Sequence, residues 1–304
     1  MVEMQGAGEA AGNTPTVSVI IPTKNRGDTI CAAISSIVAQ SHRPNELVIV
    51  DQSETDHLSD ALKHSVAGTE IKLVHLWRPN LTGLAQARNV GFDASAGDIA
   101  LFFDDDVILE TAYIEHLLRH YQNDREGGLG GVGGLITNEQ VPEPRLYKWF
   151  LRGPFADPRA RFQACPASRF QTTALAGCNM SYRREAYDRA RANEWLQGYS
   201  AGEDWELGQR ISKRFDLILT SDSKLEHRKS PINRQSERTI LANAIRSQLF
   251  FYRSLYSKRE RRHPKMQLAH IWYRGGMSAY GLARLRRGDV QFAKSTLAAT
   301  WRAP

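Results

Sequence analysis

Three consecutive carboxylates, Asp104, Asp105 and Asp106, directly follow the apolar run IALFF at residues 99–103. Ionised carboxylates this close repel one another, and a hard divalent cation, which prefers oxygen ligands, relieves that repulsion. Mg²⁺ or Mn²⁺ is the natural occupant of such a cluster. A solvated turn or a helix cap explains the triplet equally well when it is taken alone, so both interpretations stay open at this point.

A second acidic pair, Glu203 and Asp204, lies in the segment AGEDWELGQRI and begins a predicted helix over residues 203–215. The helix dipole favours ionised carboxylates in a first turn, and an ionised aspartate is a competent general base. The alternative is an ordinary charge pattern at a helix N-terminus, which is common in proteins.

Polar side chains also follow two other apolar runs. The run at 45–51 ends in a lone carboxylate, Asp51, and Arg88 falls on the first turns of a predicted helix at 83–96, where a cation can meet phosphates. Each has a plain alternative, a turn acid and a helix-surface arginine, and the loop after the first run can be an ordinary strand-to-helix connection. That loop supplies backbone and side-chain donors at four positions: Pro22, Thr23, Asn25 and Arg26.

The elements that must position these residues form an alternating pattern. Apolar runs rich in β-branched residues, at 16–23, 45–51, 71–77 and 98–103, alternate with helical patterns at 28–40, 54–67 and 83–96. Runs that are apolar on both faces indicate a parallel sheet covered by helices on each side. We therefore expect a doubly wound α/β domain with a mostly parallel sheet, which binds its ligands at the carboxyl ends of the strands.

The second half of the chain is less regular. The glycine-rich stretch 127–137 predicts one or two strands, and residues 139–170, with five prolines, predict an irregular excursion. Helices are expected at 183–191 and 203–215 and a strand at 217–222. We expect a disordered tail over 1–15, a catalytic domain over 16–235 that divides into halves 16–126 and 127–235, and a basic helical extension over 236–304.

Five segments in order resemble glycosyltransferase family 2, the inverting nucleotide-sugar transferases with the GT-A fold. They are VSVIIPTKNR, LVIVDQSETD, GLAQARNVG, GDIALFFDDDV and AGEDWELGQRI, and they span roughly residues 16–230. The resemblance implies the GT-A fold and transfer of a sugar from a nucleoside-diphosphate donor. One segment departs from the family, because ANEWLQGYSAGED replaces the Gly-Gly-Phe-Asp-Glu type of stretch that is expected before the acidic pair.

The resemblance also implies a donor site. The loop with Pro22, Thr23, Asn25 and Arg26 would lie against the nucleoside. Asp51 would accept a hydrogen bond from the base, and Arg88 and Asp105 would face the nucleotide. The Asp-x-Asp motif maps to Asp104 and Asp106, which would hold Mn²⁺ or Mg²⁺, and His227 would complete the shell of the cation. A single histidine after a strand is more often a structural or surface residue, so that alternative stays open for His227.

The acceptor side is implied in the same way. Asp204 takes the position of the general base, and Glu203 lies beside it. Trp205 is placed with the acceptor because aromatic faces stack on sugar rings. Further acceptor contacts are expected in the excursion at 139–170 and at three more residues: Gly177, Cys178 and Asn179.

Composition limits the class of protein. The 304 residues are 41% hydrophobic and 24% charged, which suffices for a substantial core. The three cysteines, Cys31, Cys165 and Cys178, have neither disulfide nor metal-site spacing, so we expect free thiols in a reducing compartment. The first 15 residues show no apolar stretch of a leader, and no segment approaches the ~20 apolar residues that span a bilayer. A cytoplasmic location is therefore expected.

The C-terminal part is strongly basic. From residue 224 onward there are 18 Lys and Arg against 4 Asp and Glu, a net charge of +14, which leaves −7 for the rest of a chain whose total is +7. No nucleic-acid-binding module is recognisable, so a nucleic acid partner is not expected. Two interpretations stay open: attachment to an anionic surface on the inner face of the cell membrane, and helices that pack on the catalytic domain with a solvated basic face.

These observations predict a metal-dependent inverting glycosyltransferase. Its acceptor would be a saccharide or lipid-linked saccharide, a precursor of polysaccharide or cell envelope. One alternative is a non-catalytic protein that binds sugar nucleotides or acts as a scaffold at a membrane surface. The other is a nucleotidyltransferase, which would need a glycine-rich phosphate loop after the first strand, and the segment PTKNRGDT lacks that glycine density.

Overall fold

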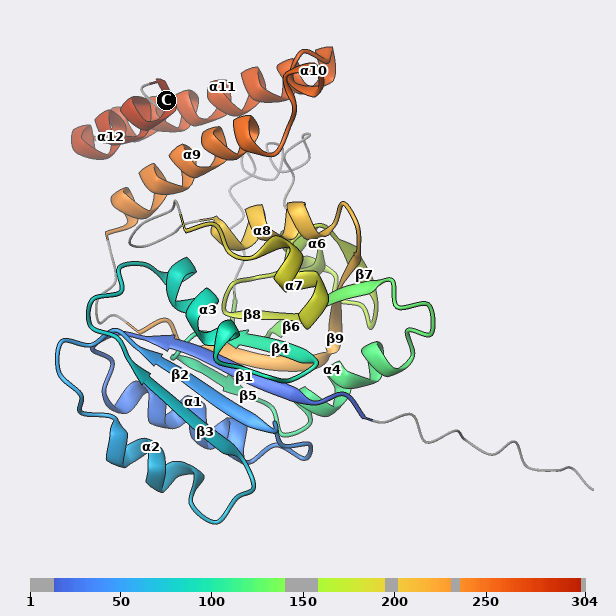
Figure 1. The fold of residues 1–304 in the computed structure, drawn as a ribbon. Coiled ribbons are helices and arrows are strands. Elements are labelled where there is room, and N and C mark those ends of the chain that lie inside the picture. The colour runs from blue at the N-terminus through green and yellow to red at the C-terminus, as the bar shows by residue number, and fades with distance from the viewer. Residues whose placement is uncertain (1–13, 140–157, 195–201, 231–235, 302–304) are drawn as a thin grey trace, which may run out of the picture.

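The computed structural model describes residues 14–139, 158–194, 202–230 and 236–301 (Figure 1). Nearly all of the predicted tail at 1–15 lies outside the described residues, and so do residues 140–157 of the predicted excursion and residues 195–201 before the acidic pair.

A nine-stranded sheet forms the centre of the described structure. Its strands are β1 (Val17–Thr23), β2 (Glu46–Asp51), β3 (Lys72–Trp77), β4 (Ile99–Phe103), β5 (Val107–Leu109), β6 (Leu129–Ile136), β7 (Phe170–Thr172), β8 (Asn179–Arg183) and β9 (Asp216–His227). The spatial order is β3-β2-β1-β4-β8-β6-β9-β5, and β7 pairs with β9.

The first four strands in this order are all parallel, as the apolar runs predict. Strand β8 is antiparallel to both β4 and β6 and joins the two halves of the domain. In the parallel part, Thr23 is in register with Asp51, and Ile20 is in register with Phe102. The carboxyl ends of β1, β2 and β4 therefore reach the same edge of the sheet, where the polar residues begin.

Helices cover both faces of the sheet (Figure 1). Before residue 230 they are α1 (Asp28–Val38), α2 (Ser59–Val66), α3 (Leu84–Asp93), α4 (Tyr113–Gln122), α6 (Pro158–Ala164), α7 (Arg184–Ala190) and α8 (Glu203–Ile211). Side chains alternate along β1: Val19 and Ile21 join the core under α1 and α4, whereas Ile20 joins the core under α3 and α7. The predicted doubly wound, mostly parallel α/β arrangement is confirmed.

The C-terminal extension is helical, as predicted. It consists of α9 (Glu237–Ser254), α10 (Lys258–Arg261), α11 (Pro264–Arg286) and α12 (Val290–Trp301). Buried Ala242, Ile245 and Ala299 form its small core, against which Tyr273 and Met277 pack. Among the described helices, none has both the length and the apolar character that crossing a membrane requires.

Candidate active site

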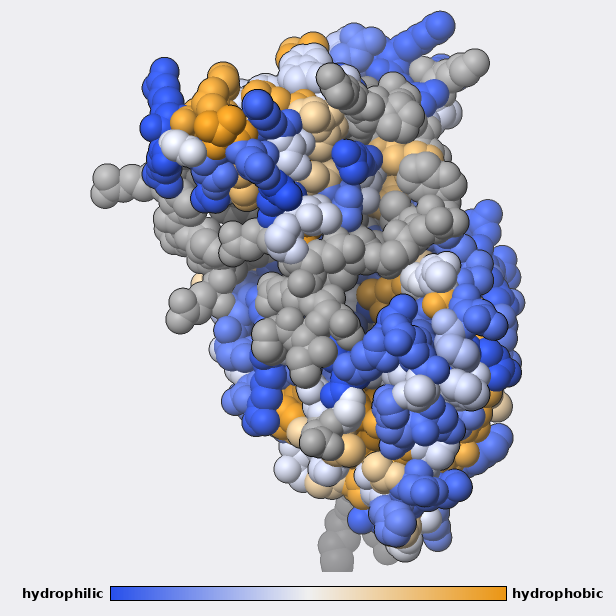
Figure 2. Space-filling model, turned by 90° about the vertical axis from the view of Figure 1, so that its left-hand side faces the viewer, coloured by the Kyte–Doolittle hydropathy of each residue, from blue (hydrophilic) through white to orange (hydrophobic). Residues whose placement is uncertain are grey.

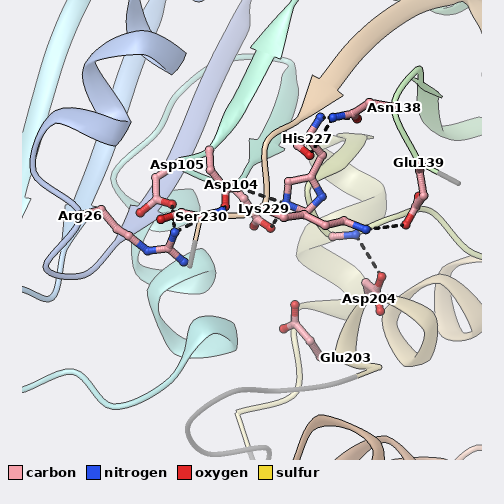
Figure 3. A network of polar contacts seen from close by, with 12 residues as sticks. Arg26, Asp104, Asp105, Asn138, Glu139, Glu203, Asp204, His227, Lys229 and Ser230 are labelled. Atoms are coloured by element: carbon pink, nitrogen blue, oxygen red, sulfur yellow. Dashed lines mark hydrogen bonds and ion pairs between the residues drawn. The ribbon is translucent and has the colours of Figure 1, made fainter. Parts of the chain in front are cut away.

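The first loop and the aspartate triplet meet at the carboxyl edge of the sheet (Figure 3). Thr23 ends β1, and its hydroxyl donates to the carboxylate of Asp105 at 2.6 Å. The Arg26 guanidinium lies 3.4 Å from Asp106 and 3.8 Å from Asp105. Two of the four predicted loop residues thus contact the triplet directly.

His227 approaches the same triplet from the end of β9. Its Nε2 lies 3.1 Å from Oδ1 of Asp106 and 3.9 Å from Oδ2 of Asp104. Strand β9 brings it there because β5, which follows the triplet, pairs with β9 so that Val107 is opposite His227. The backbone N–H of Ser230 donates to Asp106 at 2.8 Å and holds that carboxylate in place.

The three aspartates differ in their electrostatics. Burial raises the pKa of Asp104, although Arg88 and His227 oppose it, and burial raises the pKa of Asp105 to about 7 despite the Thr23 hydrogen bond. Burial also acts on Asp106, but His227, Ser230 and Arg26 outweigh it and lower its pKa. The pKa of His227 is lowered by burial and raised more strongly by Asp106 and Cys178, to about 11.

The residues at this edge fit a divalent cation. Ligand atoms of Asp104, Cys178 and His227 lie within 4.8 Å of one another. Oδ1 of Asp106 is buried and faces the His227 imidazole at 3.1 Å, so these two side chains can bind the same ion. Carboxylate and imidazole ligands together suit Mn²⁺. Mg²⁺ prefers oxygen ligands, so the carboxylates alone would suit Mg²⁺. The Cys178 thiol, which the sequence predicts on the acceptor side, also lies beside Asp104 and His227.

Arg88 connects the triplet to the second acidic pair. It lies on α3, is only 1% exposed, and donates to Oδ1 of Asp104 at 3.2 Å and to the carbonyl of Gly177 at 2.9 Å. Its other terminal nitrogen pairs with Glu203, which is also buried. The guanidinium therefore lies between the carboxylates of both halves of the domain.

Asp204 follows on the first turn of α8. Its Oδ2 accepts from Arg159 at 2.5 Å and from the backbone N–H of Gly177 at 3.0 Å, and its Oδ1 accepts from the N–H of Trp205 at 2.8 Å. Burial raises the pKa of Asp204, but Arg159, the two backbone amides and Arg88 together lower it by more. The pKa of Asp204 is therefore below its ordinary value. Asp204 is consequently an ionised carboxylate in neutral solution.

Three of the predicted acceptor residues, Gly177, Asn179 and Trp205, have different neighbours. Gly177 touches Asp204, and a Cβ at this position would lie 3.0 Å from a terminal nitrogen of Arg88, so the close approach favours glycine. Asn179 is buried in the sheet, where its amide donates to the carbonyl of Gly134 at 2.9 Å. The Trp205 ring lies 6.1 Å from the Phe251 ring of α9, measured between centroids.

The predicted nucleoside residues lie beside the end of β2. Pro22 is in register with Val50, and Asn25 has a positive φ of 52° and donates its backbone N–H to Ser53 at 2.8 Å. Asp51 is fully buried, and its Oδ2 lies 3.7 Å from Nε2 of His75. That carboxylate oxygen has no hydrogen-bond partner among the described residues.

Three residues at this edge carry no sequence pattern that points to them: Arg159, Ser230 and His75. Arg159 is the partner of Asp204 and lies on α6, inside the arginine-rich excursion, where no spacing singled it out. Ser230 contributes a backbone N–H, which no residue type reveals. His75 lies mid-strand in β3 and is partly buried, and a histidine in such a position is usually structural.

The mixed sheet with an acidic carboxyl edge is a GT-A fold, and two solved structures share it. One is the mannosyltransferase PcManGT from Pyrobaculum calidifontis in complex with GDP-Man and Mn²⁺, with a TM-score of 0.59, 16% identity, and coverage of 95% of this chain and 88% of that one. The other is GalNAc-T7 with UDP, GalNAc and Mn²⁺, with a TM-score of 0.58, 20% identity, and coverage of 80% and 49%.

The sequence itself matches the model of glycosyl transferase family 2 over residues 18–191, more than half of the chain, and the chain belongs to this family. A glucosyl-dolichyl phosphate glucuronosyltransferase of Haloferax volcanii is 28% identical over 142 residues, 44% of each chain. The glycosyltransferase GlyG of Streptococcus pneumoniae is 28% identical over 134 residues, 43% of this chain and 42% of that one.

An uncharacterized glycosyltransferase of Nostoc sp. is 30% identical over 106 residues, 35% of this chain and 33% of the relative. The chain thus matches less than half the length of these three relatives.

Proposed function

We propose that this chain transfers a sugar from a nucleoside-diphosphate donor to a hydroxyl acceptor, with a divalent cation and with inversion at the anomeric carbon. The observation that supports this most is the convergence of two acidic groups at one sheet edge. Asp104, Asp106 and His227 lie on one side, Glu203 and Asp204 lie on the other, and Arg88 joins them. Family membership and the names of the relatives agree with it.

On the donor side, the negative charge of the departing diphosphate must be offset. Asp104, Asp106 and His227 would hold Mn²⁺ or Mg²⁺, and the bound cation would offset the charge that develops on the departing diphosphate. Arg26 lies next to the triplet and supplies a further positive charge near the phosphates. The remaining donor residues are proposed as nucleotide contacts: Pro22, Thr23, Asn25, Asp51, Arg88 and Asp105.

On the acceptor side, the attacking hydroxyl must lose its proton. As the acceptor oxygen attacks the anomeric carbon, its O–H proton passes to Asp204 while the bond from that carbon to the diphosphate oxygen breaks and leaves its electron pair on the diphosphate. A base on the face opposite the leaving group produces inversion. The lowered pKa of Asp204 keeps the carboxylate ready to accept the proton. The acceptor contacts are proposed at Gly177, Cys178, Asn179, Glu203 and Trp205.

The central test is Asp204→Asn, which preserves shape and removes the base. Transfer should fall about 10²- to 10⁴-fold, the usual contribution of a general base, while donor binding measured by titration calorimetry with Mn²⁺ is retained. Asp188→Asn is the matched control, because Asp188 is an exposed partner of Arg191 and lies outside the site. Unchanged transfer in Asp204→Asn would remove Asp204 from this role.

The donor itself can be found by thermal stabilisation. A ligand that binds only the folded chain raises its melting temperature, so nucleotide sugars can be screened with and without Mn²⁺. Asp104→Asn should abolish the Mn²⁺-dependent part of the shift. Donor binding without transfer to any acceptor would favour the non-catalytic alternative, and a product that retains the nucleotide would favour nucleotidyl transfer. The acceptor, whether polysaccharide or lipid-linked, and the cytoplasmic location stay predictions.

A further inference from the structure

The outer face of helix α11 carries an exposed apolar stripe. Leu268, Ile271, Leu282 and Leu285 are 66%, 65%, 52% and 42% exposed. Their spacing places them on one side of the helix, over a length of about 26 Å at 1.5 Å per residue. Figure 2 shows apolar side chains among strongly hydrophilic ones in the upper part of the molecule, where the C-terminal helices lie.

The opposite face of α11 is already used. Tyr273 and Met277 pack against the small core formed by Ala242, Ile245 and Ala299 of α9 and α12. Within the described residues, α11 therefore has apolar side chains on two sides, and only the side with Tyr273 and Met277 is covered by α9 and α12. Large apolar side chains gathered on one exposed helix face are typical of an interaction surface.

Within α11 itself the charged side chains have one sign. The sequence of α11 contains no Asp or Glu, and Lys265, Arg286 and Arg287 are exposed at its two ends. Arg286 lies 18 residues from Leu268, about five helical turns, so it points to the same side as the stripe. Its position directly after Leu285 puts a cation at the end of the apolar row.

An amphipathic aromatic side chain borders the stripe. Trp301 is 60% exposed, its indole N–H donates to the hydroxyl of Ser278 on α11 at 3.0 Å, and the Arg274 guanidinium lies 5.3 Å from its ring centroid. Trp rings with one wet and one apolar side are favoured at membrane–water interfaces. The stripe thus combines aliphatic, aromatic and cationic groups on one exposed face.

We propose that this face of α11 docks on an anionic lipid bilayer. The aliphatic side chains would enter the boundary between headgroups and acyl chains, and the arginines would bind lipid phosphates. A second copy of the chain fits less well, because a symmetric contact would oppose the cations of two identical faces. The face belongs to a long straight helix, which matches a planar surface. This inference does not depend on the proposed reaction.

Docking would also orient the catalytic domain. Helix α9 lies between α11 and the sheet (Figure 1), and α9 contacts α8 through Phe251 and Trp205. The N-terminus of α8 carries Glu203 and Asp204. A bilayer bound at α11 would therefore lie on the side of the molecule that holds the proposed acceptor residues, which suits an acceptor with a lipid anchor.

The test is vesicle co-sedimentation of the full chain, without donor or acceptor. Wild-type protein should bind phosphatidylcholine vesicles that contain phosphatidylglycerol and not vesicles of phosphatidylcholine alone. Arg286→Gln with Arg287→Gln should lower the partition coefficient about 30-fold, and added salt should lower it further. Leu282→Ser with Leu285→Ser should lower it by about tenfold or more.

The matched control is Lys63→Gln with Arg189→Gln, two exposed cations of the catalytic domain that form surface ion pairs. It should bind like the wild type. Absence of binding to the anionic vesicles, or equal binding of wild type and both α11 variants, overturns the proposal. If the leucine variant changes the mass of the chain in solution and not its vesicle binding, a second copy is the partner and the proposal is wrong.

All four substitutions lie on exposed positions, so circular dichroism should show unchanged folding. Transfer to a soluble acceptor should also be unchanged in both α11 variants. Because vesicle binding is measured without substrates, a failure of the proposed reaction and a failure of membrane docking give separate results.

Discussion

Arg88 is a buried cation between carboxylates of both halves of the catalytic domain. Burying an arginine is unfavourable unless charged partners compensate for lost hydration, and Asp104 and Glu203 do so here. Removal of Arg88 would leave Asp104 and Glu203 without the guanidinium that lies between them. The residue therefore links the geometry of the proposed donor side to that of the acceptor side.

Arg159 controls the ionisation of Asp204 in a way that can be measured. Arg159→Gln removes the guanidinium 2.5 Å from Asp204, so the pKa of Asp204 should rise toward its ordinary range or beyond it, since burial then acts with less opposition. The base would be protonated at a higher pH than in the wild type. The acid limb of the pH profile of kcat/KM should move toward neutral pH, while transfer in alkaline buffer changes by less than about tenfold.

Arg189→Gln is the control for this change, because Arg189 forms an exposed helical ion pair with Glu185 away from the site. Its pH profile should coincide with that of the wild type. An acid limb that does not move in Arg159→Gln would mean that Arg159 does not set the charge of the base.

How much of the site is predictable depends on how each residue contributes. Asp104, Asp105 and Asp106 are visible because they are consecutive and follow a buried strand, and Asp204 is visible through the resemblance. Arg159 reaches Asp204 across 45 residues of sequence, and such a contact leaves no local pattern. Ser230 acts through its backbone, which is common to all residue types except proline.

At the scale of elements, Glu46 connects strands β1 and β2 to the turn before β4. Its carboxylate accepts from the Ser18 hydroxyl at 2.6 Å and from the N–H of Ala96, and Lys72 lies 3.7 Å away. Burial raises the pKa of Glu46, but these contacts lower it below 4.5 overall. Because the folded pKa is the lower one, the stabilisation is present above pH 4.5 and disappears as the pH falls through the folded value.

Glu46→Gln should therefore reduce the free energy of unfolding at neutral pH by about 1.5–3 kcal/mol, the range for hydrogen bonds to a charged group. The difference from the wild type should shrink in acid, once the wild-type carboxylate is protonated. Urea unfolding at neutral and acidic pH measures both effects. Glu185→Gln, at an exposed helical position, is the control, and a difference that stays constant with pH would exclude an ionised Glu46 as the cause.

Most elements are predictable from local pattern, and the departures have local causes. The helix expected from residue 54 begins at Ser59, because Asp56 accepts hydrogen bonds from the backbone and hydroxyl of Ser59 and holds the preceding turn. The glycine-rich stretch forms one strand, β6, in which a Cβ at Gly131 would lie 2.7 Å from the Tyr182 ring. The antiparallel insertion of β8 depends on long-range pairing, which no local pattern specifies.

At the scale of the whole molecule, the net charge separates the C-terminal part from the rest of the chain, whereas side-chain contacts connect the two. The C-terminal part from residue 224 carries +14 and the rest −7, which suggests two bodies, yet side chains connect the C-terminal helices to the rest of the domain. The ammonium group of Lys213 donates to the carbonyl of Leu255 at 2.8 Å, close to the end of α9. Packing between Phe251 and Trp205 adds an apolar contact. The helical extension is therefore attached to the catalytic domain at the helix that carries the proposed base.

Phe251→Ala tests whether this attachment supports the site. Phe251 is fully buried, and truncating a buried phenylalanine costs about 3–5 kcal/mol. We expect a lower melting temperature and a larger loss of transfer than of Mn²⁺-dependent donor binding, because α8 loses its support while the aspartate triplet is held between strands β4 and β5. Leu268→Ala, at a 66% exposed position on α11, is the control and should leave both unchanged. Equal losses of transfer and donor binding would mean that the contact stabilises the whole domain and does not act on α8 in particular.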